Sequence, residues 1–331
     1  MLTRQLGTQG PRVSALGLGC MGMSPGIYGP ADEGEAMATL DAALESGLTL
    51  IDTGDFYGVG HNETLIGRAL RGRRDRAVIS VKFGALRDPA GGWTGVDGRP
   101  ESVKNFLAYT LQRLGTDHVD IYRPARLDPQ VPIEETVGAI ADLVKAGYVR
   151  HIGLSEVGAA TIRRAAAVHP ISDLQIEWSL ISRGVEGEIL AACRELGIGI
   201  TAYGVLSRGL ISGHWQPQAA PAADFRAHSP RFQAGHVEHN LSLVDRIRAV
   251  AEAKGCTVAQ LAIAWVLARA ADVVPLVGAR SPARLAEAVG AVDVELQPAD
   301  LALIDQILPL GAASGDRYAP ALMAHLDSEH R

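Results

Sequence analysis

The sequence predicts an α/β protein built as one closed (β/α)8 barrel, a TIM barrel. Two observations lead to this prediction. An amphipathic helix, a glycine and a short apolar strand recur as a unit, and eight strand–helix alternations follow one another in a single run. A run of this length favours a closed barrel over an open sheet. Because no linker interrupts it, residues 1–331 are interpreted as a single domain.

The repeating unit is clearest where its helices end. Met37, Leu40 and Leu44 share one helical face before Gly47, and the apolar run 48–52 follows. A glycine just past a helix supplies the left-handed cap, and an uninterrupted apolar run suits a strand buried on both faces. The same reasoning predicts strands near 15–18, 49–52, 77–82, 119–123, 149–154, 172–176, 198–203 and 273–276, and helices near 33–46, 62–71, 101–114, 133–146, 158–168, 185–196, 240–254 and 282–290.

Three further segments lie outside these eight units. The polar alternation at residues 3–14, around Gly7-Thr8-Gln9-Gly10, predicts an N-terminal β-hairpin that plugs the bottom of the barrel. Residues 212–238 are rich in Ala, Pro and His, and we expect them to form a substrate loop or lid; a disordered surface excursion is the alternative. An extra helix near 298–308 and a C-terminal tail complete the chain.

Charge and cysteine content narrow the classes of partner. The 37 acidic residues outnumber the 31 basic ones, the formal net charge is −6, and neither sign forms a long run. This argues against a nucleic-acid partner or an anionic membrane. Cys20, Cys193 and Cys256 are too far apart for a disulfide framework or a zinc site, and no stretch has the pattern of a signal peptide or a membrane span. We therefore expect a cytoplasmic protein without a metal.

One glycine-rich stretch matches a dinucleotide-binding motif in sequence but lacks the structural context of that motif. Gly17-Leu18-Gly19-Cys20-Met21-Gly22 matches G-x-G-x-x-G after a predicted strand. Pro25 and Pro30 intervene before the next helix, and no acidic residue ends a second strand about 20 positions later, where a ribose hydroxyl would need it. The glycines are therefore interpreted as a tight strand-to-loop turn, and a Rossmann enzyme is not favoured.

Three ionisable residues fall where a barrel enzyme places its chemistry. Asp52 ends the second strand, Tyr57 follows in its loop, and Lys82 ends the third strand. Taken singly, each has an ordinary interpretation: a helix cap, a packed ring and a solvated lysine. Together they form a proton donor, an ammonium to lower its pKa, and a carboxylate to hold the ammonium. A free tyrosine titrates near about 10, so proton transfer at neutral pH needs such help.

These residues belong to stretches that resemble the aldo-keto reductase superfamily, in particular its bacterial, pyridoxal-reductase-like branch. Order and spacing agree through nearly the whole chain. The stretches are 17–24 (Gly-Leu-Gly-Cys-Met-Gly-Met-Ser), 51–58 (Ile-Asp-Thr-Gly-Asp-Phe-Tyr-Gly), 81–84 (Val-Lys-Phe-Gly), 152–155 (Ile-Gly-Leu-Ser) and 277–280 (Val-Gly-Ala-Arg). The resemblance implies reduction of an aldehyde or ketone by NADPH bound across the barrel top, with Tyr57 as acid, Lys82 lowering its pKa and Asp52 pairing with Lys82.

The resemblance also implies a set of cofactor-binding positions. Ser155, Glu156 and Gln175 match residues that hold the carboxamide, Tyr203 matches the ring that stacks on the nicotinamide, and the loop at 207–210 matches the pyrophosphate cradle. Independently of the family, Ser281-Pro282 reads as a helix N-terminus between two arginines, which is a phosphate site or, alternatively, a solvated basic turn. The full set is Gly19, Met21, Asp52, Ser155, Glu156, Gln175, Tyr203, Gly204, Val205, Leu206, Ser207, Arg208, Gly209, Leu210, Gly278, Arg280, Ser281, Arg284 and Glu287.

Two positions depart from the family pattern. Asparagine is more usual where Glu156 stands, and a carboxylate can accept from the carboxamide but cannot donate to it. The family typically reads Asp-Leu-Tyr-x-x-His-Arg-x-Asp-Pro after the fourth strand, whereas this chain has Ala125 at the histidine position. Arg123 or Arg126 could replace that donor, although pairing with Asp120 or Asp128 is favoured.

The missing histidine leaves an alternative function open. A nicotinamide-binding regulatory subunit, resembling the potassium-channel β subunits that share this barrel, would keep the cofactor site with slow turnover. For an enzyme, Phe56, Tyr57, Trp93 and Ala125 are the predicted substrate pocket, with Trp215 as a further aromatic residue. This pocket would suit a bulky ketone or an aromatic aldehyde such as pyridoxal, so the expected partner is a small carbonyl compound.

Overall fold

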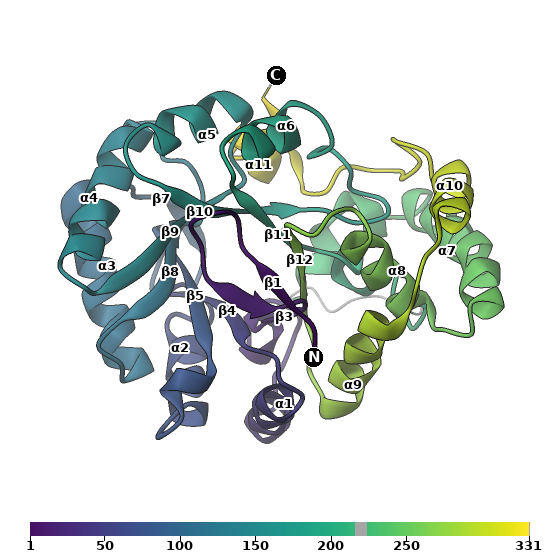
Figure 1. Ribbon diagram of the computed structural model, residues 1–331, viewed down its shortest axis with the longest axis horizontal. Coiled ribbons are helices and arrows are strands. Elements are labelled where there is room, and N and C mark those ends of the chain that lie inside the picture. The colour runs from purple at the N-terminus through teal and green to yellow at the C-terminus, as the bar shows by residue number, and fades with distance from the viewer. Residues whose placement is uncertain (216–223, 331) are drawn as a thin grey trace.

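Eight parallel strands close into a barrel in the computed structural model, which describes residues 1–215 and 224–330 (Figure 1). Each strand pairs with the next along the chain, and the last strand pairs with the first, with Leu276 opposite Gly17. The predicted (β/α)8 fold is therefore confirmed. The barrel strands are β3 (Gly17–Gly19), β4 (Leu50–Gly54), β5 (Val78–Phe83), β8 (Val119–Pro124), β9 (Val149–Ser155), β10 (Ile171–Glu177), β11 (Gly199–Tyr203) and β12 (Val273–Val277).

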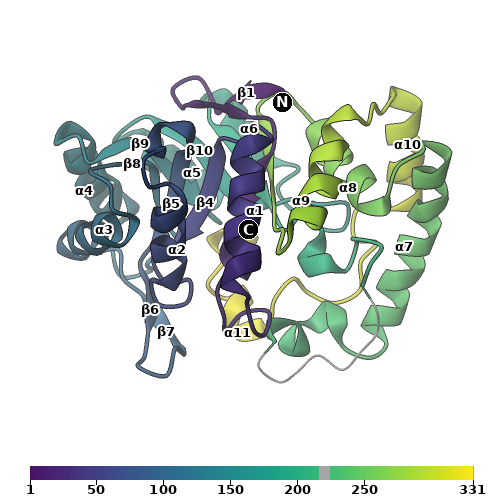
Figure 2. The same ribbon diagram turned by 90° about the horizontal axis from the view of Figure 1, so that it is seen from below.

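Helices surround this barrel on its outside, as Figures 1 and 2 show. Several begin and end as the sequence predicts: Asp32 accepts from the Glu35 N–H at 2.8 Å at the start of the first helix, and Gly115 ends the third with φ 64°. The helices are α1 (Glu33–Glu45), α2 (His61–Ala69), α3 (Pro100–Leu114), α4 (Ile133–Lys145), α5 (Ala159–Ala166), α6 (Glu188–Glu195), α7 (His236–Ala253), α8 (Val258–Leu267), α9 (Pro282–Val289), α10 (Pro298–Ile307) and α11 (Pro320–Met323).

The predicted N-terminal hairpin consists of β1 (Thr3–Gln5) and β2 (Arg12–Ser14). It closes the end of the barrel where the strands begin. Leu6 and Val13 are buried there in a small apolar core with residues of the barrel interior, namely Leu50, Ile121, Val274 and Leu276. In Figure 2 this hairpin lies at the top, and α11 lies at the opposite end. The carboxyl ends of the strands therefore remain for a functional site.

Some elements differ from the sequence prediction. Helix α8 was not predicted, because Val258–Leu267 is buried on nearly every side and shows no helical periodicity. A second hairpin, β6 (Ala85–Arg87) and β7 (Trp93–Val96), extends the third barrel loop, and α7 begins four residues before the predicted start. Part of the predicted loop at 212–238 lies outside the described residues; within them, short 3-10 turns occupy 225–228 and 230–232.

Hydropathy identifies no single helix, in the described part of the chain, that is long and apolar enough to cross a membrane. Helices α7 and α8 pass the same test only as a pair, with an 83° bend between them. Within α8 most side chains are buried inside the protein.

Candidate active site

Asp52 and Lys82 meet at the carboxyl end of adjacent strands. In the register of β4 and β5, Asp52 pairs with Ser80 and Gly54 pairs with Lys82. The side chains of Asp52 and Lys82 therefore point to the same face of the sheet. The Lys82 ammonium forms a hydrogen-bonded ion pair with Asp52. Ser80 Oγ and Gln175 Nε2 each donate to the second carboxylate oxygen of Asp52 at 2.8 Å. The carboxylate is thus held from three directions and can orient the lysine.

Tyr57 lies over this pair, with its ring centroid 5.2 Å from Lys82 Nζ. Only 6% of its surface is exposed. Burial raises the pKa of Tyr57 well above its ordinary value, the Asp52 carboxylate adds to the rise, and the Arg126 guanidinium opposes it. Burial lowers the pKa of Lys82, while its pairing with Asp52 acts in the opposite direction. Tyr57 therefore carries its proton at neutral pH. Its pKa is raised, so the net lowering that was expected from Lys82 is not observed in the protein as it stands.

A cavity of about 490 Å³ extends from Asp52 and Lys82 across the strand ends. Its size is typical of a small-molecule site. Most of the predicted cofactor set lines it: Gly19, Met21, Asp52, Ser155, Gln175, Tyr203, Gly204, Val205, Leu206, Arg208, Gly209, Gly278, Arg280, Arg284 and Glu287. The other predicted residues do not line it: Glu156, Ser207, Leu210 and Ser281, and the substrate-pocket residues Phe56, Tyr57, Trp93 and Ala125.

Three polar atoms of the predicted cofactor set are buried without a hydrogen-bond partner among the described residues. They are Ser155 Oγ, Ser207 Oγ and Arg208 Nη1. Such atoms are costly to bury, because the folded protein replaces none of the hydrogen bonds they made to water. Ser207 and Arg208 also have left-handed backbones, with φ 47° and 57°, in the turn after β11. Consecutive residues in such a turn form a concave cradle of N–H groups that suits a phosphate.

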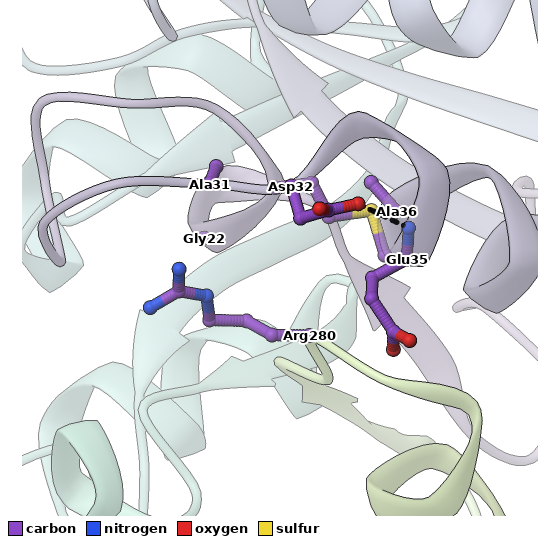
Figure 3. Close-up of a pocket in the computed structure, with 7 residues that line it drawn as sticks. Gly22, Ala31, Asp32, Glu35, Ala36 and Arg280 are labelled. Atoms are coloured by element: carbon purple, nitrogen blue, oxygen red, sulfur yellow. Dashed lines mark hydrogen bonds between the residues drawn. The ribbon is translucent and has the colours of Figure 1, made fainter.

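The far end of the cavity is formed by the start of α9. Ser281 caps this helix by accepting from the Arg284 N–H at 3.4 Å, and Pro282 is its first residue. Arg280 donates to the carbonyls of Tyr28 (3.0 Å) and Pro30. Arg280 also borders a neighbouring pocket of about 360 Å³, and in Figure 3 its side chain extends towards Gly22 and Ala31. The helix N-terminus and two arginines fit an anionic group.

Glu156 occupies a different environment from the one expected of it. It is fully buried below the cavity, and the Arg317 guanidinium donates to both of its oxygens at 2.9 and 3.1 Å. Tyr203 and Ser328 hydroxyls donate to it at 2.7 and 2.6 Å. Burial acts to raise the pKa of Glu156, but Arg317, together with Arg126 and Ser328, outweighs burial and brings the pKa down to about 2. The geometry does not support contact between this carboxylate and a carboxamide in the cavity.

Two of the predicted substrate residues, Phe56 and Trp93, are linked to one another and to Tyr57 by ring contacts. Phe56 meets the Tyr57 ring edge-on, with centroids 4.7 Å apart. The Arg87 guanidinium lies 5.6 Å from the Phe56 ring and 5.8 Å from the Trp93 ring, so it links the two. Ala125 is buried, and its side chain has no polar atom.

Arg123 and Arg126 do not pair as the sequence suggested. Arg123 is fully buried in the barrel interior, where it pairs with Asp173 at 2.8 Å and donates to Ser80 Oγ at 3.0 Å. Asp120 instead pairs with Arg74 at 2.6 Å. Arg126 lines the cavity and donates to its neighbour's carbonyl, Ala125 O, at 2.6 Å. The expectation of an ion pair with Asp120 or Asp128 was therefore wrong for both arginines.

Several cavity residues were missed by sequence reasoning. Tyr318 lines the cavity from the C-terminal tail, and its hydroxyl lies 2.9 Å from that of Tyr203. Tyr28 and Arg226 line it from the other side, where the segments at Tyr28 and Asp224 form a β-bridge. No motif or periodicity marks these positions. The only sequence signal is a tyrosine next to an arginine, at 317–318, in an otherwise irregular tail.

No group of three or more His, Cys, Asp or Glu side chains among the described residues could hold a metal ion.

Comparison with known proteins supplies the family. The model of the aldo/keto reductase family matches residues 15–309. "Probable aldo-keto reductase 1" from Glycine max is 42% identical over 316 residues, which cover 95% of this chain and 91% of that protein.

Two solved structures share the architecture. The glycerol dehydrogenase AKR11B4 from Gluconobacter oxydans has a TM-score of 0.85 at 28% identity, over 92% of this chain and 94% of that chain. The holo form of aldo-keto reductase AKR11C1 from Bacillus halodurans has a TM-score of 0.80 at 27% identity, over 96% of this chain and 99% of that chain.

Proposed function

This chain belongs to the aldo/keto reductase family, and we propose that it reduces an aldehyde or ketone with NADPH, with Tyr57 as proton donor. The observation that carries the proposal is the position of the three unpartnered buried polar atoms, at Ser155, Ser207 and Arg208. They lie on or directly beside a cavity that ends at the Asp52–Lys82 pair. A nicotinamide dinucleotide supplies the amide, phosphate and ribose groups that such atoms need.

The residues present fit this cofactor. Ser155 and Gln175 would hold the carboxamide end, Tyr203 would face the nicotinamide ring, and the turn at 207–209 would hold the pyrophosphate. Arg280, Arg284 and the start of α9 would hold the 2′-phosphate. When bound, the reduced nicotinamide supplies a hydride for the carbonyl carbon of the substrate.

The protein's own residues supply the proton. Tyr57 donates its hydroxyl proton to the carbonyl oxygen, so that hydride and proton together complete the alcohol. Lys82, fixed by Asp52, places a positive charge beside the tyrosine and stabilises the phenolate that remains. The buried position of Tyr57 keeps bulk water from competing with the carbonyl oxygen for that proton.

The proton-donor role is tested with Tyr57→Phe, which removes only the hydroxyl. Turnover of a carbonyl panel, followed by NADPH absorbance, should fall by at least about 10²-fold, which is typical of a lost general acid. NADPH affinity should stay within a few-fold. Tyr109→Phe is the matched control, because Tyr109 is exposed on α3. Wild-type turnover by Tyr57→Phe in a chemistry-limited assay would refute the assignment.

Cofactor choice is tested with Arg280→Ala/Arg284→Ala. Each charge-assisted contact with a phosphate is worth roughly 1.5–3 kcal/mol, so NADPH affinity should fall by about two to four decades. The loss of NADPH affinity should lie towards the lower end of this range. Arg280 and Arg284 must give up hydrogen bonds to Tyr28, Pro30 and Glu287 before they bind the phosphate, so their net contribution is smaller. NADH affinity should change little. Equal affinities of the wild-type protein for the two cofactors would contradict the proposal.

A regulatory, cofactor-binding role is the second candidate, and Ala125 is the residue that favours it. The apolar side chain offers no hydrogen bond to a carbonyl oxygen. Tight NADPH binding together with turnover near zero across the panel would support this role over reduction. In either case we propose a small carbonyl compound as partner, no nucleic acid or membrane, and a cytoplasmic location.

A further inference from the structure

Buried charges above the barrel are paired with one another. Glu177 lies 3.5 Å from Arg208, 3.6 Å from Arg231 and 3.3 Å from Arg317. Arg317 also pairs with Glu156 at 2.9 Å and Glu329 at 2.6 Å. Two buried carboxylates, Glu156 and Glu177, and the exposed Glu329 thus face three guanidinium groups. Each of these three guanidinium groups thus has a carboxylate within 3.6 Å, and a guanidinium in the same region without such a partner differs from its neighbours.

Arg126 is such a cation. It follows directly after β8 and the buried Ala125, is half-buried, and lines the cavity with Lys82 and Tyr318. Its one hydrogen bond among the described residues goes from Nη1 to the carbonyl of Ala125, and no carboxylate there forms an ion pair with it. A guanidinium has five N–H donors in a planar fork, so most of its capacity to bind an anion is unused.

A second guanidinium adds positive charge on the substrate side of Tyr57. Arg87 stands over the Phe56 and Trp93 rings, and its Nε is buried without a hydrogen-bond partner in the described chain. Its Nη1 donates to Gly91 O at 3.2 Å, and it forms no ion pair with a described carboxylate. The charges of both arginines act on Tyr57. Two guanidinium groups therefore lie near Tyr57, and the carboxylates that act on them, Asp55 and Asp88 on Arg87 and Glu156 on Arg126, do not form ion pairs with them.

We propose that Arg126 binds an anionic group of the substrate, so that the preferred substrates are aldehydes and ketones that carry a carboxylate or a phosphate. This rests on the proposed carbonyl reduction and narrows its substrate class. A carboxylate or phosphate matches the guanidinium fork with two parallel hydrogen bonds. In this partly buried site a charge pair interacts more strongly than in water, so the anion would add to the attraction that Glu156 already exerts on Arg126.

The kinetic test compares 4-carboxybenzaldehyde with 4-methylbenzaldehyde, which has a similar shape and no charge. In the wild-type protein kcat/KM should favour the acid by at least tenfold. In Arg126→Ala this ratio should fall at least 30-fold, mainly through a higher KM for the acid. Arg150→Ala is the matched control, because Arg150 is exposed near the start of β9, away from the cavity. It should leave the ratio unchanged.

A binding test separates this inference from the proposed function. Benzoate and phenyl phosphate are titrated calorimetrically into the wild-type protein and Arg126→Ala, after thermal melts show that both are folded. At least tenfold weaker binding of either anion by Arg126→Ala supports the inference, even if no carbonyl is reduced, and the tighter anion identifies the group. Equal binding by both proteins overturns it. A ratio unchanged by Arg126→Ala, or an equal loss of kcat for both aldehydes, overturns it as well.

Discussion

Arg317 should be one of the most stabilising charged residues of the chain, although it lies in an irregular tail. Only 8% of its surface is exposed, and it donates to Glu156, Glu177 and Glu329. Arg317→Ala would leave two of these carboxylates, at 156 and 177, buried with less compensation. Breaking a buried pair from one side typically costs about 3–5 kcal/mol. With an unfolding entropy of about 2.1 cal/mol/K per residue over the chain's length, this corresponds to a loss of roughly 4–7 °C in Tm.

The assay is urea unfolding of wild-type and variant proteins at pH 8 and pH 5. Arg164→Ala is the control, because its pair with Glu134 at 2.7 Å is exposed and screened by solvent, so its loss should have little effect on stability. Arg317 holds the pKa of Glu156 at about 2, below its unfolded value. In the wild-type protein this contribution is therefore present above the unfolded pKa and is lost only as pH falls towards 2.

The variant should respond to pH differently. Without Arg317, burial would dominate and raise the pKa of Glu156, so the carboxyl could take up a proton at pH 5 and relieve the unpaired charge. Arg317→Ala should therefore lower the free energy of unfolding less at pH 5 than at pH 8. Adding Glu156→Gln to Arg317→Ala should restore part of the stability lost at pH 8. A pH-independent loss no larger than that of Arg164→Ala would refute the reasoning.

Two further predictions concern a pair of helical glycines and a buried carboxyl. Gly67→Ala in α2 should destabilise the protein by roughly 1–3 kcal/mol in urea unfolding, because the added Cβ would lie 2.6 Å from Leu114 O. Gly138→Ala in α4 should instead stabilise the protein by about 0.5–1 kcal/mol, because the added Cβ would have no atom within 4 Å. Burial raises the pKa of Asp55 to about 7, so its charged form should destabilise the fold increasingly as pH rises from about 4 to 7. Asp55→Asn should therefore raise Tm at pH 8, with a gain that disappears towards pH 4; a gain independent of pH would contradict this.

The barrel and the centre of the site were predictable because they follow local rules. Glycine caps and apolar runs fix the helix–strand alternation, and parallel pairing brings consecutive strand ends together. Asp52 and Lys82, separated by a whole βα unit, are thereby brought into an ion pair. Tyr57 follows because its loop leaves one of these two strands.

The remaining parts depend on contacts that no local pattern encodes. Arg317 contacts Glu156 and Glu177, which are 161 and 140 residues away in the sequence. No pattern in the tail predicts these two contacts. Because the sequence does not show the contact with Arg317, Glu156 was predicted to hold the cofactor carboxamide in the cavity. Arg123 was expected to pair with Asp120 or Asp128, yet it pairs inside the barrel with Asp173, which lies two strands away. Buried ion pairs of this kind form only after the tertiary structure brings both partners together.

The closure of β12 on β3 has a consequence for how the protein is made. Leu276 must pair with Gly17 before the barrel is continuous, and the cavity is completed by Tyr318, which follows β12 in the sequence. During synthesis one edge of β3 therefore stays unpaired until β12 has been translated. An unpaired edge is prone to aggregation. A nascent chain that stalls before β12 would expose this edge on the ribosome and would lack a complete site for binding any cofactor.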